Sequence, residues 1–261
     1  MLYFLVFLIL FVIIAPALVI IPQSFTSLNY FVYPIKEFSI KWYVKFFENS
    51  EWITSLERSI IIALLVAVLA TIIGTLAALA VNKLNFKGKN LFLNLMLTPM
   101  IVPVVITGVA LYASFAKVGL NNSILGLVMA HSLLAIPMVF LTMSSALARF
   151  DTNLELAAMS MGSTHIGAFF KVTVPEVKSS LVTSALLSFV TSLDEVVVTI
   201  FVSGADTKTL PMVMWENLRA TIDPTIAVAA TFLIILTLGM YVIKLNFRMT
   251  QSYNKYLFNA V

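Results

Sequence analysis

Six long apolar segments constrain this chain more than any other feature of its sequence. A helix that crosses a bilayer needs about 20 mainly apolar residues, and this chain is 61% hydrophobic and only 11% charged. Because soluble proteins carry roughly 25% charged residues, the chain lacks the polar residues for a water-exposed surface. The segments are 2–22, 57–81, 91–116, 124–145, 179–203 and 225–245. We therefore predict an all-α, polytopic membrane protein with about six transmembrane helices, in which residues 1–261 form a single transmembrane domain.

The composition also excludes several kinds of functional site. The sequence has no cysteine and only two histidines, His131 and His165, so thiolate zinc sites, disulfides and cysteine nucleophiles are excluded. The net charge of +4 is small and the basic residues form no long run, which argues against nucleic-acid binding. H-E-x-x-H, G-x-S-x-G and P-loop motifs are absent. We therefore expect no catalytic, cofactor-binding or metal-binding residue, and no enzyme activity, on this chain.

Lysine and arginine indicate how the spans are oriented. Short cytoplasmic loops of membrane proteins carry an excess of basic residues. With an inner amino terminus, the short inner loops hold Lys83, Lys87, Lys89, Arg149, Lys171 and Lys178. We therefore predict that both termini and the loop 146–178 face the cytoplasm. The first segment lacks the basic start and short apolar run of a signal peptide, so we interpret it as a retained helix.

Prolines predict where helices begin and bend. Asp223 followed by Pro224 is typical of a helix start, with the aspartate as N-cap and proline at the first helical position. Pro103 and Pro137 fall inside the third and fourth spans. Such prolines are tolerated in a bilayer because neighbouring helices satisfy the freed backbone groups. We expect kinks at both.

Other residues suggest contacts between spans. A lone membrane histidine is usually hydrogen-bonded to a neighbouring helix, and we interpret His131 in this way, with a gating role as the alternative. Gly74 and Ala78 form a small-xxx-small pair, which suits close helix packing. The loop between the first two spans is rich in aromatic residues, and we expect Trp42 and Trp52 to anchor it at the membrane–water interface.

The inner loop 146–178 has a specific helical pattern. Thr152 with Glu155 three residues later predicts a capping box. Apolar residues then follow at i, i+3, i+4 and i+7, which is the spacing of one helix face. They are Leu154, Ala157, Ala158 and Met161. Gly162 predicts the end of this helix, because glycine readily adopts the left-handed conformation at the C′ position.

A second short helix follows in the same loop. It carries Ile166, Phe169 and Phe170 on one face, and we expect Pro175 to turn the chain toward the fifth span. Two such helices could lie among the lipid headgroups. The small side chains of the first helix instead favour close approach by another protein.

The spacing in this loop resembles a known motif. Leu156-Ala157-Ala158, three residues, Gly162, nine residues, Val172, one residue and Val174-Pro175 resemble the EAA loop of ATP-binding-cassette importer permeases. The family's glutamate position is Leu156 here, with Glu155 one place earlier. The resemblance implies a type I ABC importer permease fold and a loop that docks on an ATPase. The ATPase-coupling residues it implies are Glu155, Leu156, Ala157, Ala158, Met161, Gly162, Phe169 and Pro175.

Further segments resemble one subfamily of these permeases. They are Phe38-Ser39-Ile40-Lys41-Trp42-Tyr43, Ser192-Leu193-Asp194-Glu195-Val196-Val197, Thr209-Leu210-Pro211 and Ile222-Asp223-Pro224-Thr225. All four are similar to the second permease of spermidine/putrescine transport systems. The implied partners in a bacterial inner membrane are a second permease subunit, two ATP-binding-cassette ATPase subunits that bind ATP and Mg, and a periplasmic or extracellular solute-binding protein.

The substrate is open at this stage. The resemblance implies a polyamine, but ferric iron, a thiamine-like cation or another organic cation would fit the same importer class. A secondary transporter is the alternative from another class. Such a carrier would show paired repeats with interrupted helices, and we find no convincing duplication.

An acidic pair in the fifth span is the candidate for the substrate pathway. Each ionised carboxylate near the bilayer centre costs roughly 2.5–3.5 kcal/mol on insertion scales, so Asp194 and Glu195 need a partner or a watery cavity. Neighbouring residues differ by about 100° around a helix, so at most one of them can face the pathway. Ser188, Thr191 and Ser192 would add hydroxyl acceptors. The alternative is an ion pair or hydrogen bond with the partner permease.

Overall fold

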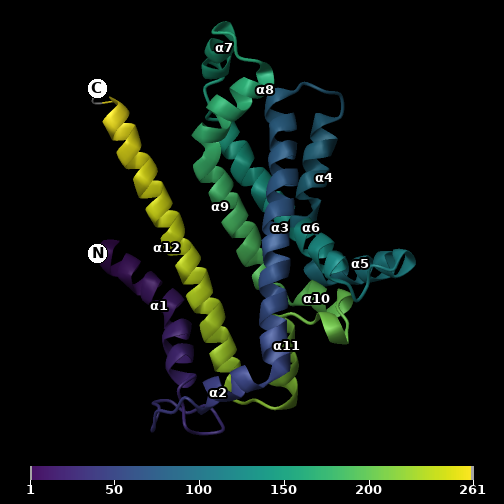
Figure 1. Cartoon of the computed structure of the whole chain (residues 1–261). Coiled ribbons are helices and arrows are strands. Elements are labelled where there is room, and N and C mark those ends of the chain that lie inside the picture. Colours follow the sequence, from purple (N-terminus) through teal and green to yellow (C-terminus); the bar gives the residue numbers. More distant parts are fainter. Residues whose placement is uncertain (1, 260–261) are drawn as a thin grey trace. The chain divides into compact units, whose positions relative to one another are not determined.

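The computed structural model describes residues 2–259, and its regular elements are helices (Figure 1). This confirms the all-α prediction. The helices that precede the inner loop are α1 (Leu2–Gln23), α2 (Lys41–Glu48), α3 (Ser50–Lys83), α4 (Lys89–Ile101), α5 (Val104–Val118) and α6 (Ile124–Leu147). Those that follow are α7 (Asn153–Ser160), α8 (His165–Ala168), the π-helical η1 (Phe169–Thr173), α9 (Val174–Leu193), α10 (Val197–Val202), the 3-10 turn η2 (Ala205–Thr207), α11 (Leu210–Ala220) and α12 (Thr225–Asn259).

Four of these helices are long and apolar enough to cross a membrane. They are α1, α3, α6 and α12, and the number rises to five if the pair α4 and α5 is counted as one broken span. The predicted fifth span is not among them in the part of the chain described. That segment is divided into α9 and α10, and α9 is rich in serine and threonine and begins with charged residues.

The predicted third span is a bent pair of helices. The axes of α4 and α5 differ by 106° (Figure 1), a sharper change than the kink expected at Pro103. Proline disfavours a helical conformation in the residue before it, and Val102 is extended, with φ −75° and ψ 130°. Pro137, in contrast, lies within the continuous helix α6.

The chain forms two compact units. The first combines residues up to Ser59 with Thr207–Met240, and the second combines Ile60–Asp206 with the chain from Tyr241 onward. We describe each unit by itself.

An aromatic core holds the first unit together. Trp42 and Phe46 on α2 are its buried residues, and Phe46 contacts the rings of Trp52 and Phe232. The Trp42 indole donates a hydrogen bond to the Leu28 carbonyl oxygen, 3.1 Å away. Trp42 and Trp52 were expected at the membrane interface, but both are buried in this core. The prediction was wrong because α11 and α12 supply apolar partners from the far end of the chain.

Helix α6 forms the centre of the second unit. Its buried residues pack with those of α3, α5, α9 and α10 in one cluster. A Cβ atom added at Gly74 would lie 2.6 Å from Val139 on α6, so these two helices touch at this glycine. Ala78 is fully buried. The predicted close packing at Gly74 and Ala78 is therefore confirmed.

The last helix begins close to the predicted position. Helix α12 starts at Thr225, and the Asp223 carboxylate accepts a hydrogen bond from the Thr225 N–H at 2.9 Å. A second Asp223 oxygen is paired with the Lys45 ammonium at 2.6 Å. The expected role of Asp223 at the helix start is confirmed, with the first helical residue one place after Pro224.

Candidate functional site

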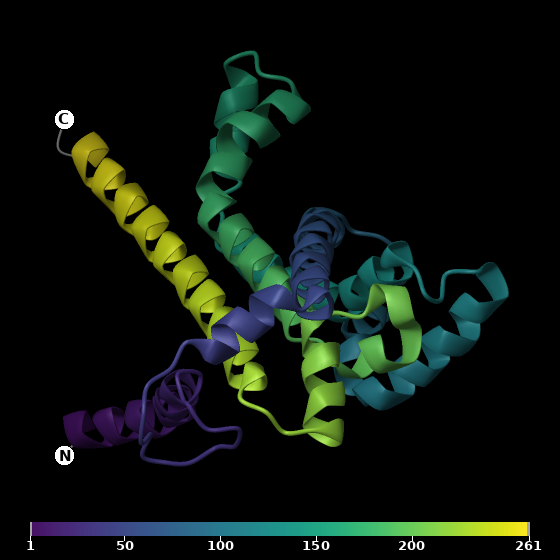
Figure 2. The same ribbon diagram turned by 60° about the horizontal axis from the view of Figure 1, so that its bottom comes forward.

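The inner loop projects from one end of the second unit as two short helices. α7 and α8 connect α6 to η1 and α9, and they lie at the same end of the pair α6 and α9 in both views (Figures 1 and 2). Helix α7 has no buried residue. The large apolar side chains of the loop that are exposed are Leu154, Leu156, Met161, Ile166 and Phe170. Met161 is 84% exposed and Ile166 is 73% exposed, so residues 2–259 leave this apolar surface uncovered.

Gly162 ends α7 as predicted. Its φ of +94° lies in the left-handed region, which glycine enters without steric cost. Its N–H donates to the Met159 carbonyl oxygen at 2.9 Å, and the Ser163 N–H donates to the Ala158 carbonyl oxygen at 3.0 Å. These bonds satisfy carbonyl groups that the end of a helix leaves free. The chain then reverses into α8, where the Thr164 hydroxyl oxygen accepts from the Gly167 N–H.

The predicted capping box is wrong. Thr152 has helical angles, φ −64° and ψ −19°, and its side chain makes no cap hydrogen bond. An N-cap side chain reaches the helix from an extended backbone, which Thr152 lacks. The Asp151 carboxylate accepts from the Asn153 N–H instead, at 3.0 Å.

Glu155 is used to anchor the loop. Its carboxylate accepts hydrogen bonds from the Lys83 ammonium and the Thr173 hydroxyl. The Lys83 ammonium also lies 5.7 Å from the centre of the Phe169 ring, within the range of a cation–π contact. These contacts join the end of α3, the start of α7 and η1. Burial raises the pKa of Glu155, but the hydrogen bonds from Lys83 and Thr173 and the charge of Lys83 lower that pKa by more, so it lies below its ordinary value.

Pro175 does not turn the chain. α8, η1 and α9 follow one another without a gap from His165 to Leu193, and Pro175 is in the first turn of α9. A proline ring clashes with the carbonyl group four residues earlier in a regular α-helix. The π-helical turn of η1, just before Pro175, has a wider hydrogen-bond spacing, which leaves room for the ring. The second loop helix is therefore continuous with the helix of the predicted fifth span.

The acidic pair lies in the break between α9 and α10, and its two members differ. The Glu195 carboxylate accepts a hydrogen bond from the Val198 N–H at 2.8 Å, so it caps the first turn of α10. The Asp194 side chain is exposed. No hydrogen bond or ion pair to its carboxylate is found among the described residues. Asp194 is the member of the pair that is free to meet a ligand or a partner.

The predicted hydroxyl acceptors are not beside Asp194 on an open surface. Ser188 and Ser192 are buried, and the Ser188 hydroxyl donates to the Ser184 carbonyl oxygen at 2.9 Å. Thr191 is half-buried, and its hydroxyl lies 3.5 Å from the Met138 sulfur. Ser192 lies 2.9 Å from Nδ1 of His131. These three side chains therefore make contacts inside the unit.

His131 is hydrogen-bonded to a neighbouring segment, as its position within a span predicts. Its second nitrogen, Nε2, lies 3.0 Å from the Thr199 hydroxyl. Sequence reasoning missed Thr199. The only local indication was a hydroxyl group four residues after Glu195. No local pattern shows that residues on both sides of a helix break form hydrogen bonds with the same histidine.

Comparison with known proteins identifies the family. Residues 70–249 match the family model for the binding-protein-dependent transport system inner membrane component. The chain belongs to this family. Its members are multi-pass inner membrane permeases of ABC importers, which carry no cofactor and act with ATPase subunits and a solute-binding protein. The chain is therefore a non-catalytic transport subunit, and the alternative of a secondary transporter is set aside.

Relatives of this permease include named polyamine transport proteins. The spermidine/putrescine transport system permease protein PotC of Haemophilus influenzae is 32% identical over 87% of this chain and 88% of its own length. The putrescine transport system permease protein PotI of Escherichia coli K12 is 31% identical over 84% of this chain and 80% of its own length.

Solved structures share the fold of the permease. A chain from a bacterial ABC transporter that imports the acidic polysaccharide alginate gives a TM-score of 0.73 at 12% identity, covering 94% of this chain and 93% of that one. A chain of the MetNI methionine ABC transporter gives a TM-score of 0.61 at 18% identity, covering 78% of this chain and 98% of that one. The predicted type I importer permease fold is confirmed.

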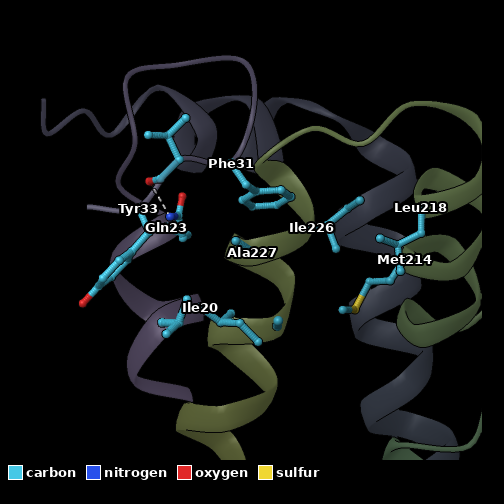
Figure 3. Close-up of a pocket in the computed structure, with 11 residues that line it drawn as sticks. Ile20, Gln23, Phe31, Tyr33, Met214, Leu218, Ile226 and Ala227 are labelled. Atoms are coloured by element: carbon cyan, nitrogen blue, oxygen red, sulfur yellow. Dashed lines mark hydrogen bonds between the residues drawn. The ribbon is translucent and has the colours of Figure 1, made fainter. Parts of the chain in front are cut away.

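The first unit of the permease contains an apolar cavity of about 560 Å3 (Figure 3). Residues from α1, α11 and α12 line it, together with the loop segment 31–33. The Gln23 amide donates to the Val32 carbonyl oxygen at 2.6 Å, the dashed line in Figure 3. The lining includes no charged side chain. A multiply charged solute would lose its hydration there without gaining an ion pair, so the cavity does not suit a cationic substrate.

Proposed function

We propose that this permease forms half of the translocation pathway of an importer for polyamines such as spermidine and putrescine. The observation that carries the proposal is the exposed Asp194 carboxylate at the break of the predicted fifth span, which has no hydrogen-bond or ion-pair partner within the part of the chain that the structure describes. Its neighbour Glu195 is engaged in capping α10. An anionic group within a membrane segment is costly unless it serves a substrate or a partner, and a protonated amine supplies the matching charge. The similarity to PotC and PotI supports the same substrate class.

The inner loop serves as the contact with the ATPase in this proposal. Its exposed apolar side chains include Leu156 and Met161, and apolar side chains of this kind form the centre of protein interfaces. The Glu155 carboxylate fixes α7 through Lys83 and Thr173. A movement of the ATPase can therefore pass to α3 and, through η1, to α9. Leu156, at the family's glutamate position, contributes apolar area, and Glu155 supplies the ion pair.

The proposed assembly has this chain as one of two different permease subunits, with two ATPase subunits and a periplasmic binding protein. We also propose that residues 1–261 act as one transmembrane domain, with both termini and the loop 146–178 in the cytoplasm. The excess of basic residues in the short inner loops supports this orientation. Reporter fusions after Lys87 and after Asp206 test it, since the first must be active inside and the second outside.

The substrate role is tested with the complete importer in proteoliposomes. Uptake of labelled spermidine and putrescine is measured for Asp194→Asn and for Glu195→Gln, together with ATP hydrolysis. We expect Asp194→Asn to raise the KM for uptake by about tenfold or more, because one charged contact contributes about 1.5–3 kcal/mol. Glu195→Gln keeps an oxygen that can cap α10, so its KM changes by less than about threefold.

Two outcomes would contradict this function. An unchanged KM in Asp194→Asn removes Asp194 from the pathway. Uptake of ferric iron or a thiamine-like cation, without uptake of either polyamine, would be consistent with an importer permease but would exclude polyamines as its substrate.

A further inference from the structure

His131 contacts both sides of the break that precedes α10. Its imidazole is fully buried on α6. Nδ1 lies 2.9 Å from the Ser192 hydroxyl, in the last turn of α9, and Nε2 lies 3.0 Å from the Thr199 hydroxyl, on α10. The interrupted segment, Asp194 to Val196, lies between these two hydroxyl groups in the sequence. One side chain thus ties both ends of the break to a third helix.

The hydrogen bonds around His131 suit a neutral imidazole. The Thr199 hydroxyl donates its single proton to the Glu195 carbonyl oxygen, 3.1 Å away. In that arrangement it accepts from the Nε2–H of His131, one of the two neutral tautomers that suit these contacts. Nδ1 then has a free lone pair, which accepts the Ser192 proton. A neutral imidazole can thus act as donor to one hydroxyl group and as acceptor from the other. This series of hydrogen bonds continues through the Thr199 hydroxyl to the Glu195 carbonyl group, in the backbone of the break itself.

Apolar contacts hold the neighbouring helices without this histidine. On α10, Val198 and Val202 are fully buried, and the Phe201 ring lies so close to Gly108 that a Cβ atom there would be 2.4 Å from it. α9 packs along α6 with Phe189 and Leu193 buried. The contribution particular to His131 is therefore the geometry of the short break and not the packing of the helices.

We infer that His131 is a positioning residue that fixes the break between α9 and α10 and thereby sets the direction of the Asp194 carboxylate. Asp194 is two residues after Ser192 and is followed directly by Glu195, whose carbonyl group ends the hydrogen-bond chain. Loss of the imidazole leaves two buried hydroxyl groups without their partner and frees the backbone of the break. The effect on transport rests on the proposed role of Asp194, whereas the geometry of the break can be measured without it.

The absence of cysteine makes this geometry measurable, because an engineered thiol is the only one on the permease. The probe is Asp194→Cys in the assembled importer, modified by a cationic, membrane-impermeant methanethiosulfonate. The matched control is Lys117→Cys, an exposed position on α5 of the same unit, whereas the hydrogen-bond partners of His131 are on α9 and α10. Complexes without either substitution give the background from partner subunits.

We expect His131→Ala to change the modification rate of Asp194→Cys by about fivefold or more, since a lost buried partner shifts a local equilibrium by about this factor. The rate at Lys117→Cys stays within about twofold. His131→Gln, whose amide keeps one donor and one acceptor, moves the rate back toward that of the parent. Ser192→Ala combined with Thr199→Val reproduces His131→Ala, and adding His131→Ala to that pair changes nothing further.

Equal modification rates at position 194 with and without His131 would overturn the inference. If His131→Ala fails to assemble, Ser192→Ala and Thr199→Val each remove one contact, and unchanged rates in both overturn it equally. A normal KM for Asp194→Asn rejects the substrate role and leaves the modification rates as an independent result. The two proposals therefore fail separately.

Discussion

The ammonium group of Lys83, in the last turn of α3, pairs with the carboxylate of Glu155 in the first turn of α7. The two residues are 72 positions apart in the sequence. The Thr173 hydroxyl donates to the same carboxylate from η1. The loop that carries the exposed apolar surface is thus tied to the end of α3 and to η1, which continues into α9.

Removal of the Glu155 charge is expected to weaken coupling more than folding. The Lys83 and Glu155 side chains are 30% and 17% exposed, and a pair at this exposure contributes about 1 kcal/mol. Glu155→Gln should therefore lower substrate-stimulated ATP hydrolysis several-fold while the importer still assembles. The exchange of charges in Lys83→Glu with Glu155→Lys should recover part of the lost activity. Equal activity in the single variants and the parent would show that the ion pair has no part in coupling.

The same pair predicts a pH dependence. The pKa of Glu155 in the folded protein is below its ordinary value, because the hydrogen bonds from Lys83 and Thr173 outweigh the effect of burial. Its stabilisation is therefore complete above the ordinary pKa of a glutamate and is lost as the pH falls through the lower, folded value. Thermal unfolding of the purified permease should show an acid-side loss of stability that is smaller in Glu155→Gln. An identical acid-side loss in both proteins would assign it to other carboxylates.

Substitutions at Gly162 and Gly119 distinguish an effect on ATPase binding from an effect of backbone strain alone. Both have positive φ, +94° and +71°, and an added Cβ atom would meet nothing within 4 Å at either one. Each change to alanine should therefore cost about 1 kcal/mol from the backbone alone. We expect Gly162→Ala, in the loop 146–178 that is proposed to contact the ATPase, to reduce co-purification of the ATPase, and Gly119→Ala, at the end of α5, to leave it intact. Similar loss in both variants would indicate general destabilisation.

Glu195 is expected to act on the structure of the break. Its carboxylate accepts from the Val198 N–H, and removal of such a cap costs about 1 kcal/mol. Glu195→Ala should lower the melting temperature of the permease by a few degrees, and Glu195→Gln should lower it by less. Asp194→Ala serves as the matched control, because the Asp194 carboxylate has no partner among the described residues. A larger loss in Asp194→Ala would reverse these roles.

Gly74 tests the contact between α3 and α6. A Cβ atom there would lie 2.6 Å from Val139 and 3.1 Å from the Ile136 carbonyl oxygen. Overpacking of this kind costs about 1–3 kcal/mol, so Gly74→Ala should destabilise the permease in detergent. Val139→Ala removes the Cγ1 atom at 2.7 Å but keeps the Cβ atom at 2.6 Å, whereas Val139→Gly removes both. Gly74→Ala combined with Val139→Gly should therefore be less unstable than the sum of the two single variants. Simple additivity would mean that the helices move apart at no cost.

Local patterns predicted the features that depend on neighbouring residues. The long apolar segments predicted α1, α3, α6 and α12, because a bilayer selects for length and hydropathy within one stretch of chain. Gly162 predicted the end of α7, since a positive φ is a property of one residue. The capping box predicted at Thr152 and Glu155 was wrong, because a local pattern does not include contacts with distant residues. Their spacing fits a capping box, but Glu155 has stronger partners from distant helices.

The sequence by itself determined that this chain is a helical membrane protein with a short-helix loop suited to a partner. Only the tertiary structure decided how the polar residues are used. Asp194 and Glu195 are adjacent and chemically alike, and they differ because a helix break gives one of them a backbone N–H to bind. His131 has two partners on either side of that break. Which hydrogen bonds form inside a membrane protein depends on which helices pack together in three dimensions, and no local pattern specifies that packing.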